Sequence, residues 1–267
     1  MDINSRLTEL AQQARVQFNT SLTIEDRAEI PASLAIPKEN NHWLRYEDVT
    51  CVYADMVKST ELSVTKAPQT VGKMYELFTG NVVNIMNHLF EADYIDVRGD
   101  GAFGLFVGRA GLYKAVAAAI TIKTFIEFHA RDIASTLGIS TPLASHIGMQ
   151  RGRLLAKRIG LRGDFQNEVW AGKPVNVAAK FAALGGSNEL VTSKEVFDAL
   201  GSDLLYKSCG CTRNKDGSAT YTGAVKDTWE PPTPVEYSKY GTTSVYKLKT
   251  SWCPNHGDDY CRQILEL

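Results

Sequence analysis

The chain has 267 residues, of which 44% are apolar, and a formal net charge of -1 at pH 7. A chain of this length and composition buries a substantial core as one large domain, or one domain with extensions. The near-neutral charge excludes an overall basic field that recruits nucleic acid. The first residues carry no secretory signal, and the alanine-rich run 115–122 is too short to span a bilayer. We therefore expect a soluble, cytoplasmic protein with no nucleic-acid or membrane partner.

The first 45 residues predict a helix and an arm that leads into the main domain. A helix over residues 1–20 would gather its apolar side chains on one face, at Leu7, Leu10, Ala14 and Phe18. Residues 21–45 have a mixed composition with two prolines and predict no long regular element. We therefore assign residues 1–45 to an N-terminal helix and arm.

A strand, a long helix and a β-hairpin follow. Alternation after residue 48 predicts a strand, one face of which carries Val49, Cys51, Tyr53 and Asp55. The next stretch has the apolar stripe of a helix packed on a sheet, at Val71, Met74, Phe78, Val82, Ile85 and Leu89. Residues 94–98 and 102–107 then predict a β-hairpin around the turn at residues 99–101.

The order of the elements is typical of a ferredoxin-like α+β domain. A second long helix is predicted over residues 111–134, with inward side chains at Leu112, Ala115, Ala119, Ile122 and Ile126. Two strands, 145–150 and 153–159, a helix over 174–183, a short strand and a helix capped by Ser193 follow. We assign this βαββαβ pattern to one domain, residues 46–203, and residues 204–267 to a β-rich C-terminal extension of it.

Two acids lie where apolar strands end, 45 residues apart. Asp55 closes the first strand, and Asp100 lies in the hairpin turn. A strand, helix and hairpin in this order can bring both carboxylates to one edge of the sheet. Two such groups need a cation, and hard oxygen ligands favour Mg²⁺ or Mn²⁺, the usual metals for reactions at phosphorus. The alternatives are that Asp55 caps the following helix and that Asp100 is a plain turn acid.

Three short motifs occur in a fixed order, at residues 53–60, 99–101 and 170–180. They resemble, in that order, the first metal motif, the second metal aspartate and the transition-state helix of the class III nucleotidyl cyclases, the adenylate and guanylate cyclase family. The strand around residues 146–152 fits between the last two. This resemblance covers about residues 49–200. It implies the ferredoxin-like cyclase fold and the cyclisation of a ribonucleoside triphosphate to its 3′,5′-cyclic monophosphate.

The resemblance also implies roles for single residues. Asp55, Asp100 and the main-chain carbonyl of Met56 would hold two Mn²⁺ or Mg²⁺ ions per site. Asn176 would orient the ribose, and Lys180 stands where the family has an arginine that stabilises the transition state. Lysine lacks the planar fork of arginine, so Lys180 either supplies charge alone or is a solvated helix residue. Because the family builds its sites between two antiparallel subunits, the resemblance implies a homodimer.

The base-reading positions differ from those of adenylate cyclases, since Asp96 replaces a lysine and Val169 replaces an aspartate or threonine. An ionised Asp96 would repel the acceptor N1 of adenine but would accept a hydrogen bond from N3–H of uracil or the amine of cytosine. Tyr53, on the face of Asp55, would narrow the pocket for a smaller ring. Arg98, on the face of Asp96, is a candidate phosphate ligand.

This combination resembles the pyrimidine cyclases of the Pycsar antiphage system. The resemblance implies a uridylate or cytidylate cyclase, with UTP favoured over CTP, and a separate effector protein that reads the cyclic nucleotide. Three alternatives stay open. The first is that the chain is a guanylate or adenylate cyclase. The second is that it is a degenerate nucleotide-binding dimer that serves as a scaffold. In the third, Asp96 is a strand acid paired with Arg98 or Arg153.

Four of the five cysteines lie in the last quarter of the chain, close to one histidine. Cys209, Cys211, Cys253, His256 and Cys261 offer the ligand types of a structural Zn²⁺ site. Their spacing fits no standard zinc module, so the alternative is a set of free, reduced thiols.

Overall fold

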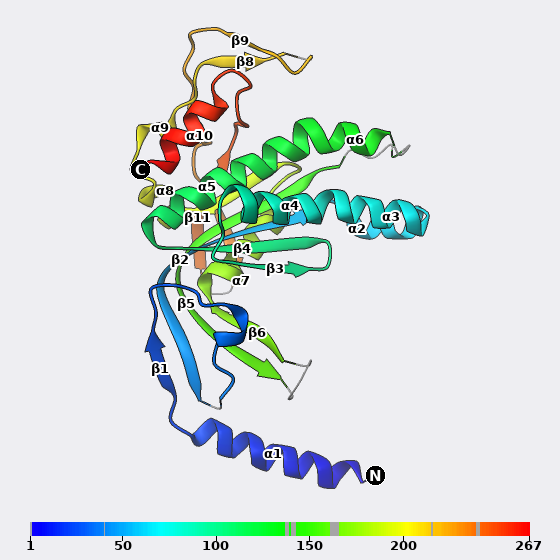
Figure 1. The fold of residues 1–267 in the computed structure, drawn as a ribbon, viewed down its shortest axis with the longest axis vertical. Helices are drawn as coiled ribbons and strands as arrows, with labels where there is room; N and C mark the ends of the chain where they lie inside the picture. The colour runs from blue at the N-terminus through cyan, green and yellow to red at the C-terminus, as the bar shows by residue number, and fades with distance from the viewer. Residues whose placement is uncertain are drawn as a thin grey trace.

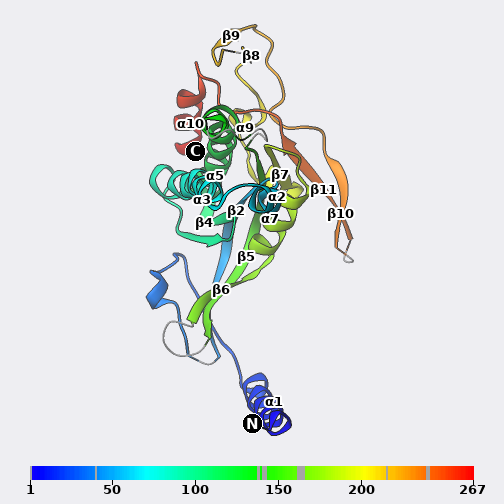
Figure 2. The ribbon, with the colours of Figure 1, turned by 90° about the vertical axis from the view of Figure 1, so that its right-hand side faces the viewer.

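The computed structural model describes residues 2–39, 41–136, 139, 143–160, 166–214, 216–238 and 241–267. A central sheet runs through the molecule, with helices on both of its faces (Figure 1, Figure 2). Its strands are β1 (Thr23–Asp26), β2 (His42–Met56), β3 (Tyr94–Arg98), β4 (Gly101–Val107), β5 (Ser145–Gly160), β6 (Gln166–Gly172), β7 (Glu189–Ser193), β10 (Thr233–Ser238) and β11 (Gly241–Leu248). A separate hairpin joins β8 (Cys211–Arg213) and β9 (Ala219–Tyr221).

The helices vary widely in length. In chain order they are α1 (Ile3–Asn19), α2 (Ser59–Thr65), α3 (Pro68–Tyr75), α4 (Asn81–Asn84), α5 (Gly108–Phe125), α6 (Arg131–Ser135), α7 (Lys173–Leu184), α8 (Lys194–Ala199), α9 (Asp203–Tyr206) and α10 (Gly257–Leu265). Three π-helical turns lie at Glu76–Gly80, Ile85–Leu89 and Ile126–Ala130, and a 3-10 turn lies at Ser33–Ala35. The π-helical turns join and extend α3, α4, α5 and α6, so the two long predicted helices are present.

The predicted ferredoxin-like core is confirmed. Strand order through the sheet is β10-β11-β7-β5-β2-β4-β3, with β1 paired to β2 and β6 to β5. The four strands β5-β2-β4-β3 pair antiparallel and have the order of the predicted βαββαβ unit. The two strands predicted around Gly152 are one continuous strand, β5, in which Gly152 adopts φ +155°. The capping of α8 by Ser193 is confirmed, since its side chain accepts a hydrogen bond from the Val196 amide.

Alternation along β2 sends its side chains to two different cores. Val52, Ala54 and Met56 pack with the long helices α3–α4 and α5 on one face of the sheet. Cys51 and its neighbours on the other face pack against α7. On this face α7 lies directly on the backbone of β5, because a Cβ at Gly148 of that strand would fall 1.9 Å from the Ala178 carbonyl oxygen.

One end of the sheet extends into a group of paired strands, the β5–β6 arm, which the sequence did not predict and which is not the N-terminal arm assigned to residues 1–45. β1, the first half of β2, the second half of β5 and β6 pair there beyond the helices (Figure 1). Tyr46, Leu154 and Trp170 are buried in it. The predicted helix α1 is present beyond the arm. It buries none of its residues, and its Phe18 is 90% exposed.

The C-terminal region combines strands with a helix. β10 and β11 extend the central sheet beside β7, as a β-rich extension would. The helix α10 was not predicted, and its Ile264 packs into the core that contains α5. Among the described residues no helix is both long and apolar enough to cross a membrane.

Candidate active site

The strands β2, β4 and β3 form one side of the candidate site. Phe103 of β4 pairs with Tyr53 on one side and with Asp96 on the other. Two residues further along, Gly101 pairs with both Asp55 and Arg98. Because directly paired residues point to the same face of a sheet, these side chains share one surface.

The two predicted metal ligands lie close together at the end of this surface. Gly99 adopts φ +65° in the two-residue turn between β3 and β4, which places Asp100 next to the end of β2. Burial and the nearby Asp100 carboxylate raise the pKa of Asp55 to about 6. Among the described residues, neither carboxylate accepts a hydrogen bond or forms an ion pair. Two neighbouring acids without a cation are electrostatically unfavourable, and a divalent ion would remove the repulsion.

The alternative role of Asp55 as a helix cap does not agree with the structure. The residue before α2 is Lys58, in a left-handed conformation, and no side chain caps this helix. The two carboxylates at the strand end are hard oxygen ligands that fit Mg²⁺ or Mn²⁺, and the main-chain carbonyl of Met56, the next residue of β2, would add a third oxygen of the same type. The Met56 side chain itself is buried.

Gly101 leaves room for the Asp55 side chain because glycine has no Cβ. A Cβ at this position would lie 2.6 Å from Oδ1 of Asp55 and 2.8 Å from the Ala54 carbonyl oxygen. The glycine therefore lets the hairpin approach β2 closely enough for Asp55 and Asp100 to interact.

The predicted base-reading acid is already paired. Asp96 forms an ion pair with Arg98, as the alternative interpretation expected, and its side chain is only 20% exposed. Arg98 is 54% exposed and lies at the open edge of the surface. Burial, Asp55 and Asp100 raise the pKa of Tyr53, so its hydroxyl stays protonated and can donate a hydrogen bond.

Two side chains of β6, Trp170 and Glu168, contact Tyr94 of β3, and these contacts were not predicted from the sequence. The ring of Tyr94 lies 4.5 Å from that of Trp170, and its hydroxyl lies 3.4 Å from the Glu168 carboxylate. Strand alternation then points Val169, which is 36% exposed, to the opposite side of β6. Tyr94 lies two residues before Asp96 on the same strand face, and this alternation could have identified it as a residue of the site from the sequence.

Asn176 and Lys180 lie on the solvent side of α7. The helix buries Pro174, Val177, Ala178, Phe181 and Ala182. Asn176 and Lys180 are exposed and one turn apart. Within the described residues neither side chain has a hydrogen bond or ion pair. This helix therefore presents an amide and a free ammonium group to whatever binds its outer face.

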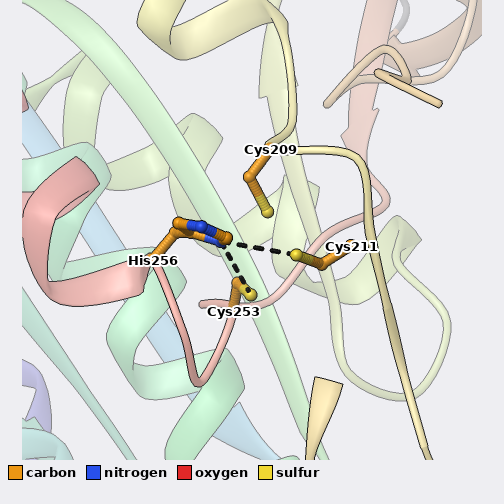
Figure 3. Close-up of side chains that lie close together, drawn as sticks. All are labelled: Cys209, Cys211, Cys253 and His256. Carbon is orange, nitrogen blue, oxygen red and sulfur yellow. Dashed lines mark hydrogen bonds between the residues drawn. The ribbon is translucent and has the colours of Figure 1, made fainter. Parts of the chain in front are cut away.

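A second group of candidate ligands lies at the C-terminal end. The side chains of Cys209, Cys211, Cys253 and His256 converge, and their ligand atoms all lie within 4.8 Å of one another (Figure 3). Cys261, the fifth predicted ligand, is not part of this group and packs against the core instead.

Comparison with known families gives a direct result. Residues 42–223 match the family described as adenylate and guanylate cyclase catalytic domain. The chain belongs to this family. It is therefore a class III nucleotidyl cyclase, a phosphorus–oxygen lyase, as its three motifs predicted.

Relatives and solved structures agree with this membership. A uridylate cyclase of Micromonospora echinofusca is 30% identical over 270 residues, covering 100% of this chain and 85% of the relative. A uridylate cyclase of Propioniciclava tarda is 27% identical over 269 residues, covering 98% and 84%. The adenylyl cyclase CyaB from P. aeruginosa has a similar fold, with a TM-score of 0.61 at 15% identity over 78% of this chain and 96% of that chain. The guanylyl cyclase Cya2 has a TM-score of 0.60 at 18% identity, covering 79% and 95%.

Proposed function

We propose that this cyclase acts on a pyrimidine nucleotide, with UTP preferred and CTP second, and releases the 3′,5′-cyclic monophosphate and pyrophosphate. The observation that carries the proposal is the similarity, over nearly the whole chain, to two proteins named uridylate cyclase. An acid at position 96 supports it, because beside its ion pair with Arg98 the carboxylate has a second oxygen that can accept the N3–H of uracil, whereas it offers no donor to N1 of adenine.

The chain's own residues have distinct tasks in this reaction. The ribose 3′-hydroxyl attacks the α-phosphorus, the bond to pyrophosphate breaks, and the hydroxyl proton leaves to solvent. Asn176 would hold the ribose, and Lys180 would place positive charge beside the phosphorane. Two Mg²⁺ or Mn²⁺ ions, held by Asp55, Asp100 and the Met56 carbonyl, would acidify the hydroxyl and neutralise the triphosphate.

We further propose that the working unit is a homodimer. What supports this is the outer face of α7, where Asn176 and Lys180 are exposed and, among the described residues, have no partner in their own chain. In an antiparallel dimer these groups would complete the carboxylate site of the other subunit.

The substrate assignment is tested with purified protein, Mn²⁺ and each of the four ribonucleoside triphosphates, with the products resolved by mass. We expect cyclic UMP first and cyclic CMP second, both lost in Asp55→Asn and retained in the surface control Asp132→Asn. Cyclic GMP or cyclic AMP as the main product would contradict the interpretation of Asp96. No product with any triphosphate, together with tight nucleotide binding, would favour the scaffold alternative.

The resemblance to Pycsar cyclases supports a cellular role as well. On this proposal the cyclic nucleotide is a second messenger in antiphage defence, made in the cytoplasm and read by a separate effector. Cells that carry the complete system with the wild-type chain should resist phage. Cells with Asp55→Asn at equal expression should not, and equal resistance of both would contradict a defence role for the cyclic product.

A further inference from the structure

The Cys/His cluster, defined as Cys209, Cys211, Cys253 and His256, has no role in the proposed reaction. Figure 3 shows the three sulfur atoms and the imidazole ring directed toward one common point. Nδ1 of His256 lies 3.3 Å from Sγ of Cys211 and 3.7 Å from Sγ of Cys253. All three thiols are free, and all four residues are partly buried.

These separations match those of a tetrahedral zinc site. With Zn–S bonds of about 2.3 Å and Zn–N bonds of about 2.0–2.1 Å, neighbouring ligand atoms lie roughly 3.5–3.8 Å apart. The ligand atoms here lie within 4.8 Å of one another, so small rotations of the side chains would bring them into this geometry. Three thiolates and one imidazole form a common ligand set of structural zinc.

Contacts independent of the cluster fix the Cys253 half. Ser251 bonds to Glu127 of the helical run that extends α5, and the indole nitrogen of Trp252 donates to the Thr121 hydroxyl at 2.7 Å. The Gly257 amide donates to the Cys253 carbonyl at 2.7 Å, which closes the turn that carries His256 at the start of α10.

Other contacts fix the Cys209–Cys211 half. Gly210 adopts φ +74° between the two cysteines, so the chain turns back and both sulfur atoms face the same side. The Gly210 carbonyl accepts hydrogen bonds from the amide and the hydroxyl of Thr222, at 3.0 and 2.7 Å. Two separately held segments therefore deliver four ligands to one point, although Cys211 and His256 are 45 positions apart.

We propose that the Cys/His cluster binds one structural Zn²⁺ ion. With four protein ligands the site is closed, so the ion would stabilise rather than catalyse. It would tie the β8–β9 hairpin to the start of α10, and α10 packs on α5. A metal bound to both Cys209 and His256 closes the chain between them into a loop. The loop restricts the conformations of the unfolded chain, so metal binding adds stability to the C-terminal region.

The first test measures the metal content of protein purified without chelators from zinc-supplemented cells. We expect about one zinc per chain in the wild type. Cys209→Ser and His256→Ala should each retain less than about a fifth of it, because a site with three ligands binds zinc far more weakly. The matched control is Cys261→Ser, which removes a nearby thiol outside the cluster and should keep all of the zinc. Asp55→Asn should also keep it, which separates this site from the carboxylates.

A second measurement uses the wild-type protein alone, so the proposal stays testable even if the ligand variants do not fold. Removing zinc with a strong chelator should lower Tm by more than about 5 °C, and added Zn²⁺ should restore it. Replacement by Co²⁺ should give the visible absorption of a tetrahedral thiolate site. Three results would overturn the proposal: no zinc in the wild type, equal zinc in Cys209→Ser, or a disulfide within the cluster in the mass of the unreduced protein.

Discussion

The charge of the candidate active site depends on two carboxylates near the end of β2, those of Asp55 and Asp100. Burial raises the cost of ionising Asp55, and the nearby Asp100 carboxylate adds to it, so the pKa of Asp55 is raised to about 6. An acid whose pKa is raised on folding stabilises the protein below its unfolded pKa. That contribution is lost as pH rises through the folded value.

We therefore expect Asp55→Asn to stabilise the protein above pH 6 in buffer without added Mg²⁺ or Mn²⁺. The gain should be about 1–2 kcal/mol after allowing for solvent screening at this partly exposed site, and it should vanish near pH 4. Urea unfolding of wild type and variant across this pH range measures the difference. Asp132→Asn is the control, and an equal pH dependence of wild type and Asp55→Asn would show that folding does not raise the pKa of Asp55.

Gly101 is the second residue on which the site depends. In Gly101→Ala the new methyl group would meet Oδ1 of Asp55 and the Ala54 carbonyl, so the hairpin must move. We expect a loss of about 1–3 kcal/mol in stability and at least about a tenfold loss in activity. Gly80→Ala is the matched control, because a Cβ at Gly80 has no neighbour within 4 Å. Wild-type kcat in Gly101→Ala would contradict this account.

At the scale of elements, α7 shows how a helix can serve packing and chemistry at once. Its inner face is fixed by the sheet, where only glycine fits at position 148. Its outer face carries Asn176 and Lys180. Substitutions on the outer face should therefore change activity without changing the fold.

We expect Lys180→Ala to lower kcat by a factor that corresponds to about 2–4 kcal/mol, with an unchanged Tm. Lys180→Arg should keep or raise kcat, since arginine supplies the same charge with a planar fork. Initial rates with UTP and thermal melts measure both effects. If Lys180→Ala were fully active, the lysine would be an ordinary solvated residue.

The π-helical turns explain one wrong prediction at this scale. Leu89 was predicted to face the core and is 60% exposed, whereas Met86 is buried. A π turn takes more than four residues, so it rotates every later side chain relative to an ideal α-helix. The predicted pattern held through Val82 and Ile85, which are buried beyond the first π turn, and failed at Leu89, at the end of the second.

At the scale of the whole molecule, the proposed dimer makes a prediction that no single chain can satisfy. Asp55→Asn and Lys180→Ala should each be nearly inactive. When the two are mixed and allowed to exchange subunits, half of the dimers are mixed and each of these has one intact site. Activity should then recover to about a quarter of the wild-type value. No recovery after demonstrated subunit exchange would mean that each site lies within one chain.

The sequence by itself determined the ferredoxin-like order, the helix boundaries around α7 and the two acids that end in one place. These follow from periodicity and turn chemistry, which are local, together with motifs whose order the family keeps. The β5–β6 arm, the helix α10 and the convergence of Cys209, Cys211, Cys253 and His256 were decided only by the tertiary structure. The pairing of β2 with β5 in the arm, the packing of α10 on α5 and the Cys/His cluster depend on contacts between segments far apart in the chain, and no local pattern specifies which distant segments meet.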